Sequence, residues 1–223
     1  NSDYVHISTM SPTLTDRSKA KSALTNFKDL MRGYSTFLAI NKTTGRMELD
    51  RSFQIELPPY TQDLADSGKL VSDGWVFINS YNSEMAVGGN MDGKQPIEAG
   101  ASKGDFDYLH IINWKKAEQV AGTRSRTING MRVIPLDVAV SEGILYLAPE
   151  PKSPHGVDVT PTGQDLVVGG KLDAHVTVYS FAQIQELIQS QTFDGRDAYG
   201  VPILPFDRSI RGQVDIGLGP LHT

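Results

Sequence analysis

Cysteine is absent from this chain of 223 residues, which excludes disulfides, thiolate metal ligands and cysteine nucleophiles within it. The sequence also lacks any apolar run of about eighteen residues, the length that a membrane-spanning helix needs. No basic stretch occurs, and the formal net charge of -5 disfavours nucleic-acid binding, because backbone phosphates require a positive surface. Hydrophobic residues make up 39% and charged residues 21%, which is ordinary for a folded globular protein.

Without cysteine, a transition metal bound by this chain would depend on imidazole and carboxylate ligands. The five histidines are His6, His110, His155, His175 and His222. Most histidines in proteins bind no metal, so a ligand role needs support from the surrounding sequence.

Short apolar stretches with an alternating pattern indicate β-structure along most of the chain. The expected strands cover 34–40, 46–55, 74–79, 106–112 and three stretches between 156 and 180. Meanders that recur about every 40 to 50 residues are typical of β-propeller blades. The predicted fold class is therefore all-β, a partial β-propeller with short helical excursions.

Two stretches, 18–31 and 181–191, carry apolar residues at helical spacing, and a third helix is expected at 113–120. No linker rich in proline, glycine or serine divides the chain, so we expect one domain over residues 1–223. The chain begins at Asn1, and its last residues look like the start of a strand. We therefore expect an excerpt of a longer protein, with this domain incomplete.

The run Pro-Lys-Ser-Pro-His-Gly-Val-Asp-Val-Thr-Pro-Thr-Gly at 151–163 resembles the copper-dependent nitrous-oxide reductases. The terminal run Gly-Leu-Gly-Pro-Leu-His-Thr at 217–223 resembles the same family, as do the blocks Asn-Ser-Asp-Tyr at 1–4 and Tyr-Asn-Ser-Glu at 81–84. Four blocks in the family's order and spacing make a specific pattern, and they extend over essentially the whole chain. The sequence between them departs from the best-known members, which indicates a divergent branch.

The family fold is a seven-bladed β-propeller followed by a cupredoxin-like domain with a dinuclear copper site. By resemblance, residues 1–223 are part of the N-terminal propeller domain, and the C-terminal copper domain is absent from this chain. The propeller hub of the family holds a tetranuclear copper–sulfide cluster on seven histidines. The resemblance makes His155 and His222 two of these catalytic copper ligands, and imidazole suits copper. The alternative is a pair of surface-loop histidines.

The other three histidines do not match ligand positions of the family. His110 and His175 lie in alternating strand patterns, so we expect packed or surface side chains there. His6 follows the opening block and receives no assignment.

The resemblance also implies a calcium site beside the copper cluster, built from carboxylate and backbone oxygens. The matching residues are Tyr81, Glu84, Met91 and Asp107, with Ser153 at the position of a fifth ligand. The family usually has asparagine at that fifth position, so Ser153 is a departure. The alternatives are a strand-end carboxylate for Glu84 and a solvated loop edge for Asp107.

The activity that the resemblance implies is the two-electron reduction of nitrous oxide to dinitrogen and water, a reaction of denitrification. A cytochrome c or a cupredoxin would donate the electrons, the enzyme would be a periplasmic homodimer, and this excerpt alone would be inactive. The alternative is a non-enzymatic propeller that presents its loops to a protein partner, because propeller folds host many functions. An acidic loop at 56–66 lies where the family has acidic residues near the substrate entrance, and no role is assigned to it.

Overall fold

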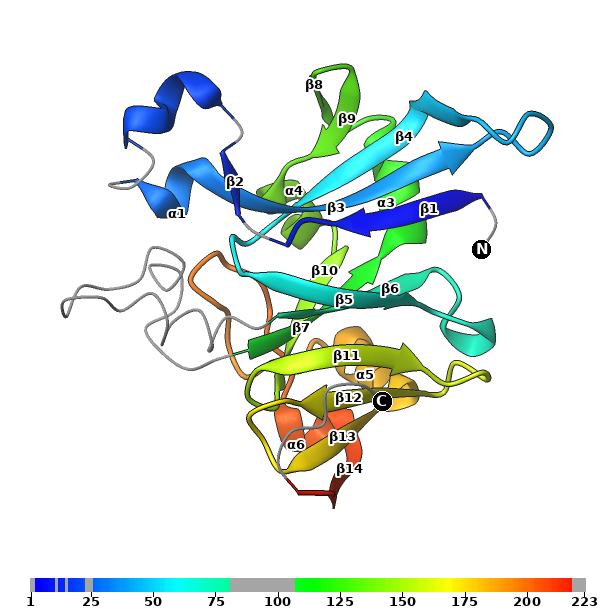
Figure 1. The fold of residues 1–223 in the computed structure, drawn as a ribbon, viewed down its shortest axis with the longest axis vertical. Helices are drawn as coiled ribbons and strands as arrows, with labels where there is room; N and C mark the ends of the chain where they lie inside the picture. Colours follow the sequence, from blue (N-terminus) through cyan, green and yellow to red (C-terminus); the bar gives the residue numbers. More distant parts are fainter. Residues whose placement is uncertain (1–2, 11, 15, 23–25, 81–106, 218–223) are drawn as a thin grey trace.

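The computed structural model of this chain describes residues 3–10, 12–14, 16–22, 26–80 and 107–217. Three β-sheets are stacked along the longest axis, with the N-terminal sheet at one end and the C-terminal sheet at the other (Figure 1). Short helices lie between and beside the sheets. The prediction of a mostly β fold with short helical excursions is confirmed.

The strands are β1 (Tyr4–Ser8), β2 (Thr13–Leu14), β3 (Met31–Ile40), β4 (Met47–Leu57), β5 (Gln62–Ser67), β6 (Trp75–Ser80), β7 (Asp107–Asn113), β8 (Arg126–Ile128), β9 (Met131–Ile134), β10 (Leu145–Glu150), β11 (Pro154–Val159), β12 (Asp165–Gly170), β13 (His175–Ser180) and β14 (Ile210–Asp215). The helical segments are η1 (Arg17–Ser22), α1 (Phe27–Leu30), η2 (Leu70–Ser72), α3 (Trp114–Ala121), α4 (Leu136–Ser141), α5 (Phe181–Gln189) and α6 (Phe206–Ser209).

The first sheet has the strand order β1-β3-β4-β9-β8, and β2 pairs with β3. Its pairings are antiparallel except that of β4 with β9, which is parallel. Alternate residues of β3 and β4 point to one face of a sheet, so Phe37, Phe53 and Ile55 make this face apolar and pack it against the second sheet.

The second and third sheets are antiparallel meanders of four strands each. Their strand orders are β5-β6-β7-β10 and β11-β12-β13-β14. Strand β5, the first of the second sheet, lies beside β11, the first of the third sheet (Figure 1). Between β7 and β10 the chain forms α3, β8, β9 and α4, and this excursion adds β8 and β9 to the first sheet.

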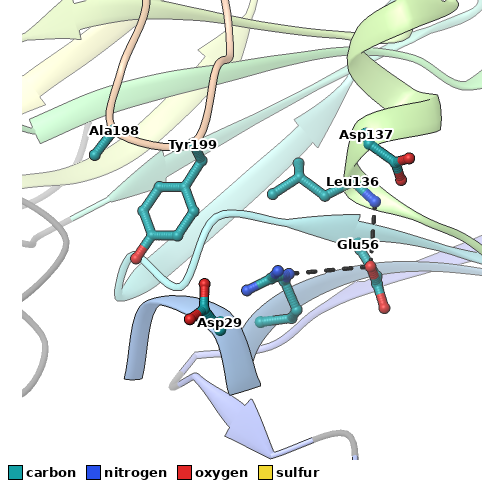
Figure 2. Close-up of a pocket in the computed structure, with 7 residues that line it drawn as sticks. Asp29, Glu56, Leu136, Asp137, Ala198 and Tyr199 are labelled. Atoms are coloured by element: carbon teal, nitrogen blue, oxygen red, sulfur yellow. Dashed lines mark hydrogen bonds and ion pairs between the residues drawn. The ribbon is translucent and has the colours of Figure 1, made fainter. Parts of the chain in front are cut away.

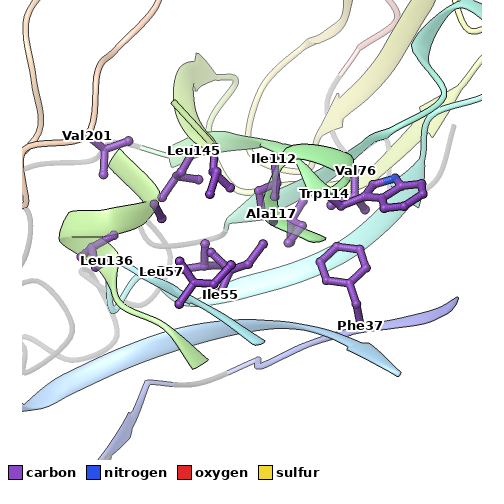
Figure 3. Packing of buried hydrophobic residues seen from close by; sticks show 14 of the residues in the cluster. Phe37, Ile55, Leu57, Val76, Ile112, Trp114, Ala117, Leu136, Leu145 and Val201 are labelled. Carbon is purple, nitrogen blue, oxygen red and sulfur yellow. The ribbon is translucent and has the colours of Figure 1, made fainter. Parts of the chain in front are cut away.

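The second sheet is covered on both faces, because its strands alternate between two hydrophobic clusters. In β6, Val76 and Ile78 belong to the cluster against the first sheet, whereas Phe77 belongs to the cluster against the third sheet. Figure 3 shows part of the first cluster, where Ile55 and Leu57 of β4 lie close to Ala117 of α3. The long apolar runs of β6 and β7 follow from this double burial.

Two of the three expected helices are confirmed. Helix α3 occupies the stretch expected at 113–120, and Asn113 caps it by accepting a hydrogen bond from the amide of Lys116 (3.0 Å). Helix α5 occupies most of 181–191. The expected helix at 18–31 is confirmed in part: η1 and α1 cover most of its described residues, but Met31 already belongs to β3, where pairing with β2 and β4 outweighs the local helical spacing. Within the described ranges, no helix has the length and apolarity needed to cross a bilayer.

The interpretation of 56–66 as an acidic loop is also wrong. Strand β4 continues to Leu57 and β5 begins at Gln62, so only residues 58–61 connect the two strands. Glu56 is 3% exposed, and Gln62 is fully buried. The polar sequence of β5 forms a strand because it pairs with β6, a tertiary contact that local composition does not predict.

Candidate functional site

The predicted copper ligand His155 is hydrogen-bonded to a carboxylate on a different sheet. His155 is the second residue of β11, and Asp63 is the second residue of β5. Because the two strands lie side by side, the imidazole Nδ1 of His155 contacts Oδ2 of Asp63, although 92 residues separate them in sequence. The side chain of His155 is 28% exposed and that of Asp63 is 10% exposed.

This contact suits an imidazole that binds a metal. An ionised carboxylate can only accept hydrogen bonds, so the proton of a neutral His155 ring lies on Nδ1 and the lone pair on Nε2. Metal-binding histidines typically donate their other ring N–H to a carboxylate or a carbonyl. The chemistry of His155 therefore fits a copper ligand.

A second set of contacts joins β5 and β11 at their other ends. Oδ2 of Asp66 accepts hydrogen bonds from the amide of Val159 (2.9 Å) and from Nζ of Lys69 (2.7 Å). Nζ of Lys69 also donates to the carbonyl of Val159 (2.6 Å). The two strands are thus fixed at both ends, which holds His155 opposite Asp63.

Asn79, at the end of β6, supports the residue that follows His155. Its Oδ1 accepts a hydrogen bond from the amide of Gly156 (3.2 Å), and its Nδ2 donates to Oε1 of Glu150 (2.6 Å). Burial raises the pKa of Glu150 well above its usual range, and the nearby charges of Asp107 and Asp63 act in the same direction. Sequence reasoning missed Asp63, Asn79 and Glu150, because each contacts residues that are distant in the sequence.

Two residues of the predicted calcium site are brought together. The amide of Ser153 donates a hydrogen bond to Oδ2 of Asp107 (2.7 Å), and both residues are buried. The alternative interpretation of Asp107 as a solvated loop edge is therefore wrong. Ser153 has a φ of 50°, and it precedes His155 by two residues, so this contact also anchors the start of β11.

The other described histidines occupy packed or partly exposed positions away from the candidate site, as expected for His110 and His175. His110 is fully buried in β7, and burial lowers its pKa to about 4. His175 is half-exposed, and its Nδ1 contacts the neighbouring Asp173 (2.8 Å). Nε2 of His6 contacts the hydroxyl of Ser35 (2.8 Å), and burial lowers the pKa of His6 to about 4.

The other predicted ligands lie outside the described residues. These are His222 of the copper site and Tyr81, Glu84 and Met91 of the calcium site. Among the residues that the structure describes, no group of three or more histidine, aspartate or glutamate side chains is arranged to hold a metal ion. The assignments of both metal sites therefore stay predictions.

A cavity of about 320 Å³ lies elsewhere, between α1, β4, α4 and the segment before α6 (Figure 2). Glu56 lies in its wall, and its Oε2 is 4.0 Å from Nε of Arg32. The same oxygen accepts a hydrogen bond from the amide of Leu136 at the start of α4 (3.1 Å). Arg126 also forms an ion pair with Glu56. These contacts tie β4, β8 and α4 together, and none of the predicted site residues lines this cavity.

The described residues define a mostly β protein with a partly buried histidine–carboxylate pair between the first strands of two meanders. No family model matches the chain. It is similar to nitrous-oxide reductases: 36% identical over 179 residues to that of Ralstonia nicotianae and 34% over 179 residues to that of Cupriavidus necator. The protein of Pseudomonas fluorescens is 25% identical over 150 residues. These matches support a distant relationship to this family.

The matches cover most of this chain but little of each relative. The two more similar proteins match 80% of the chain, and the third matches 64%. The chain spans about a fifth of the length of these curated relatives, with 21%, 22% and 20% covered. Among solved structures, hydrazine synthase of Kuenenia stuttgartiensis has a TM-score of 0.50 at 13% identity, over 86% of this chain and 45% of that chain, which is a likeness of fold alone.

Proposed function

We propose that this chain is a segment of a copper-dependent nitrous-oxide reductase and that His155 and His222 are two of the ligands of its catalytic copper–sulfide cluster. The proposal is carried by the similarity to nitrous-oxide reductases over 80% of the chain. It is supported by the surroundings of His155, whose Nδ1 is hydrogen-bonded to Asp63 as in many metal-binding histidines.

The same proposal makes this chain part of an N-terminal β-propeller and assigns its second and third sheets to blades. Propeller blades are four-stranded antiparallel meanders arranged around a central axis. The second and third sheets have this strand order, and their first strands lie side by side. In a propeller, these first strands would line the hub, so His155 and Asp63 would lie next to the axis.

The proposed reaction takes up two electrons and two protons and converts nitrous oxide to dinitrogen and water. A bound copper cluster would supply the electrons in pairs. It would also offer more than one metal ion to bind nitrous oxide, which is a weak ligand. The chain's own contribution is to orient an imidazole. Asp63 keeps the His155 proton on Nδ1, and the contacts of Asp66 and Asn79 hold β11 in place. The protein tunes such a centre through these outer contacts.

We also propose a calcium site at Tyr81, Glu84, Met91, Asp107 and Ser153, next to the copper ligand. The contact of Asp107 with the Ser153 amide supports it, because these two residues are predicted ligands from distant parts of the sequence. The electron donor, the location, the oligomeric state and the second copper domain are proposed from the resemblance to the family. The electron donor would be a cytochrome c or a cupredoxin, the complete enzyme would be a periplasmic homodimer, and a C-terminal cupredoxin-like domain would carry the dinuclear copper site.

The calcium proposal predicts that Glu84→Ala in the complete protein lowers the melting temperature and abolishes its rise on calcium addition. A cation present at a hundred times its Kd stabilises the folded state by roughly 2.7 kcal/mol, and loss of a charged ligand weakens that linkage. The measurement is thermal unfolding with calcium or with a chelator. Glu142→Ala, which removes a carboxylate paired with Arg124, is the control. A normal calcium response in Glu84→Ala would contradict the assignment.

The functional proposal predicts that the complete protein contains copper and reduces nitrous oxide, whereas the 223-residue chain alone does not. The chain offers two of the seven histidines, so a tetranuclear cluster has too few ligands to form. Metal analysis, visible absorption and a nitrous-oxide assay after reconstitution with copper and sulfide would measure this. Substantial turnover by the isolated chain would contradict the assignment of its ligands.

A further inference from the structure

We infer that Asp63 is the positioning residue of the copper ligand His155, an inference that rests on the proposed function. The hydrogen bond from Nδ1 of His155 to Oδ2 of Asp63 fixes which ring nitrogen carries the proton, and it fixes the orientation of the ring. Asp63 itself does not bind the metal in this scheme. It acts through His155.

The positions of Asp63 and His155 in the fold support a specific role for their contact. Asp63 and His155 occupy equivalent positions, each the second residue of the first strand of its meander. The contact joins two sheets, and the interaction of Asp66 with Val159 fixes the register of the same two strands. The contact between Asp63 and His155 therefore depends on how the two sheets pack together and not on a local turn.

Burial strengthens the hydrogen bond between His155 and Asp63. At 10% exposure, the Asp63 carboxylate is largely removed from water, so it needs a hydrogen-bonding partner. In such surroundings a hydrogen bond to a charged group is stronger than in water and is little affected by salt. Asp63 thus holds His155 more firmly than a surface carboxylate would.

The chain contains a matched pair for comparison. Nδ1 of His175 contacts Oδ1 of Asp173, but these residues are two positions apart, and their side chains are 42% and 31% exposed. This pair lies at the start of β13, away from the first strands of the meanders. The chemical groups are the same, whereas the burial and the connection between sheets differ.

Asp63→Ala in the copper-loaded complete protein should weaken copper retention by about ten- to a hundredfold, the typical effect of losing an outer partner of a metal ligand. Asp63→Asn should weaken copper retention less, because its amide oxygen can still accept a hydrogen bond from Nδ1 of His155. Asp173→Ala should leave copper retention unchanged. Retention is measured as copper lost to a competing chelator, in variants whose thermal unfolding shows that they are folded.

A second measurement does not depend on copper. The ¹⁵N shifts of the His155 ring in the metal-free protein at pH 8 should report a proton on Nδ1, and Asp63→Ala should shift the population toward the Nε2–H form. A proton on Nε2 in the unaltered protein would overturn the inference. So would unchanged copper retention in Asp63→Ala if His155→Ala loses copper. Full retention in His155→Ala would instead overturn the proposed function, and the inference with it.

Discussion

We expect that replacing His155 or His222 with alanine in the complete protein would remove the copper of the proposed catalytic cluster and abolish nitrous-oxide reduction, while a separate electron-entry site would keep its copper. Copper ligation needs the lone pair of a neutral imidazole, which alanine does not provide. Loss of an outer partner costs about ten- to a hundredfold in affinity or activity, so loss of a ligand should cost more than a hundredfold. Metal analysis and turnover of the purified variants in the complete protein measure both effects.

The other histidines provide the controls for this experiment. His175→Ala should leave copper content unchanged and alter stability by no more than about 0.5 kcal/mol, because the side chain is half-exposed. His110→Ala should also keep copper, but this variant loses a fully buried ring and is destabilised. If His155→Ala and His222→Ala keep their copper and turnover, these two histidines are not ligands of the catalytic cluster. If the complete protein contains no copper and has no turnover, the non-enzymatic scaffold is the better interpretation.

Acidification from pH 6.5 to pH 4 should cost the folded state about 3 kcal/mol through His110 alone. Burial lowers the pKa of His110 from 6.5 to about 4, and in the unfolded chain the ring regains its ordinary pKa. Between these values the unfolded state binds the proton and the folded state does not. The contribution of His110 is therefore fully present above pH 6.5 and is lost as the pH falls toward 4.

Urea unfolding at a series of pH values tests this expectation. His110→Gln removes the titrating ring, so its stability should fall less steeply over this interval, whereas His175→Gln should keep the original slope. The ring of Tyr60 lies 5.9 Å from that of His110, and Nδ1 of His110 contacts the backbone carbonyl of Tyr108 (3.2 Å). Burial raises the pKa of both phenols, so they stay neutral throughout. The pKa of His6 is also lowered to about 4 by burial, so some acid sensitivity should remain. An unchanged slope in His110→Gln would contradict the assignment.

Elements with strong local signals could be predicted from the sequence. Helix α3 has apolar residues at helical spacing behind the cap at Asn113, so its existence and its start follow from adjacent residues. Strands β6 and β7 are continuous apolar runs, which sheets covered on both faces require. In these cases the local pattern and the tertiary environment favour the same structure.

The elements around the candidate site could not be predicted in this way. The sequence Gln-Asp-Leu-Ala-Asp-Ser of β5 is too polar to indicate a strand, and pairing with β6 determines its structure. The partner of His155 lies 92 residues earlier in the sequence, and no spacing rule connects residues of different sheets. The motif at 151–163 therefore points to His155 as a candidate ligand but not to the carboxylate that contacts it.

Ser153 has a left-handed backbone at the position where the resembled family usually has asparagine. Among non-glycine residues, asparagine adopts a φ near 50° more readily than serine does. The backbone bonds of Ser153 link its amide to Asp107 and its carbonyl to the amide of Lys171 (2.9 Å). Neither bond uses the side chain, so the exchange preserves both and changes only the oxygen offered beside Asp107. An exchange at this position can thus change the side chain beside Asp107 while the backbone contacts that anchor the start of β11 stay in place.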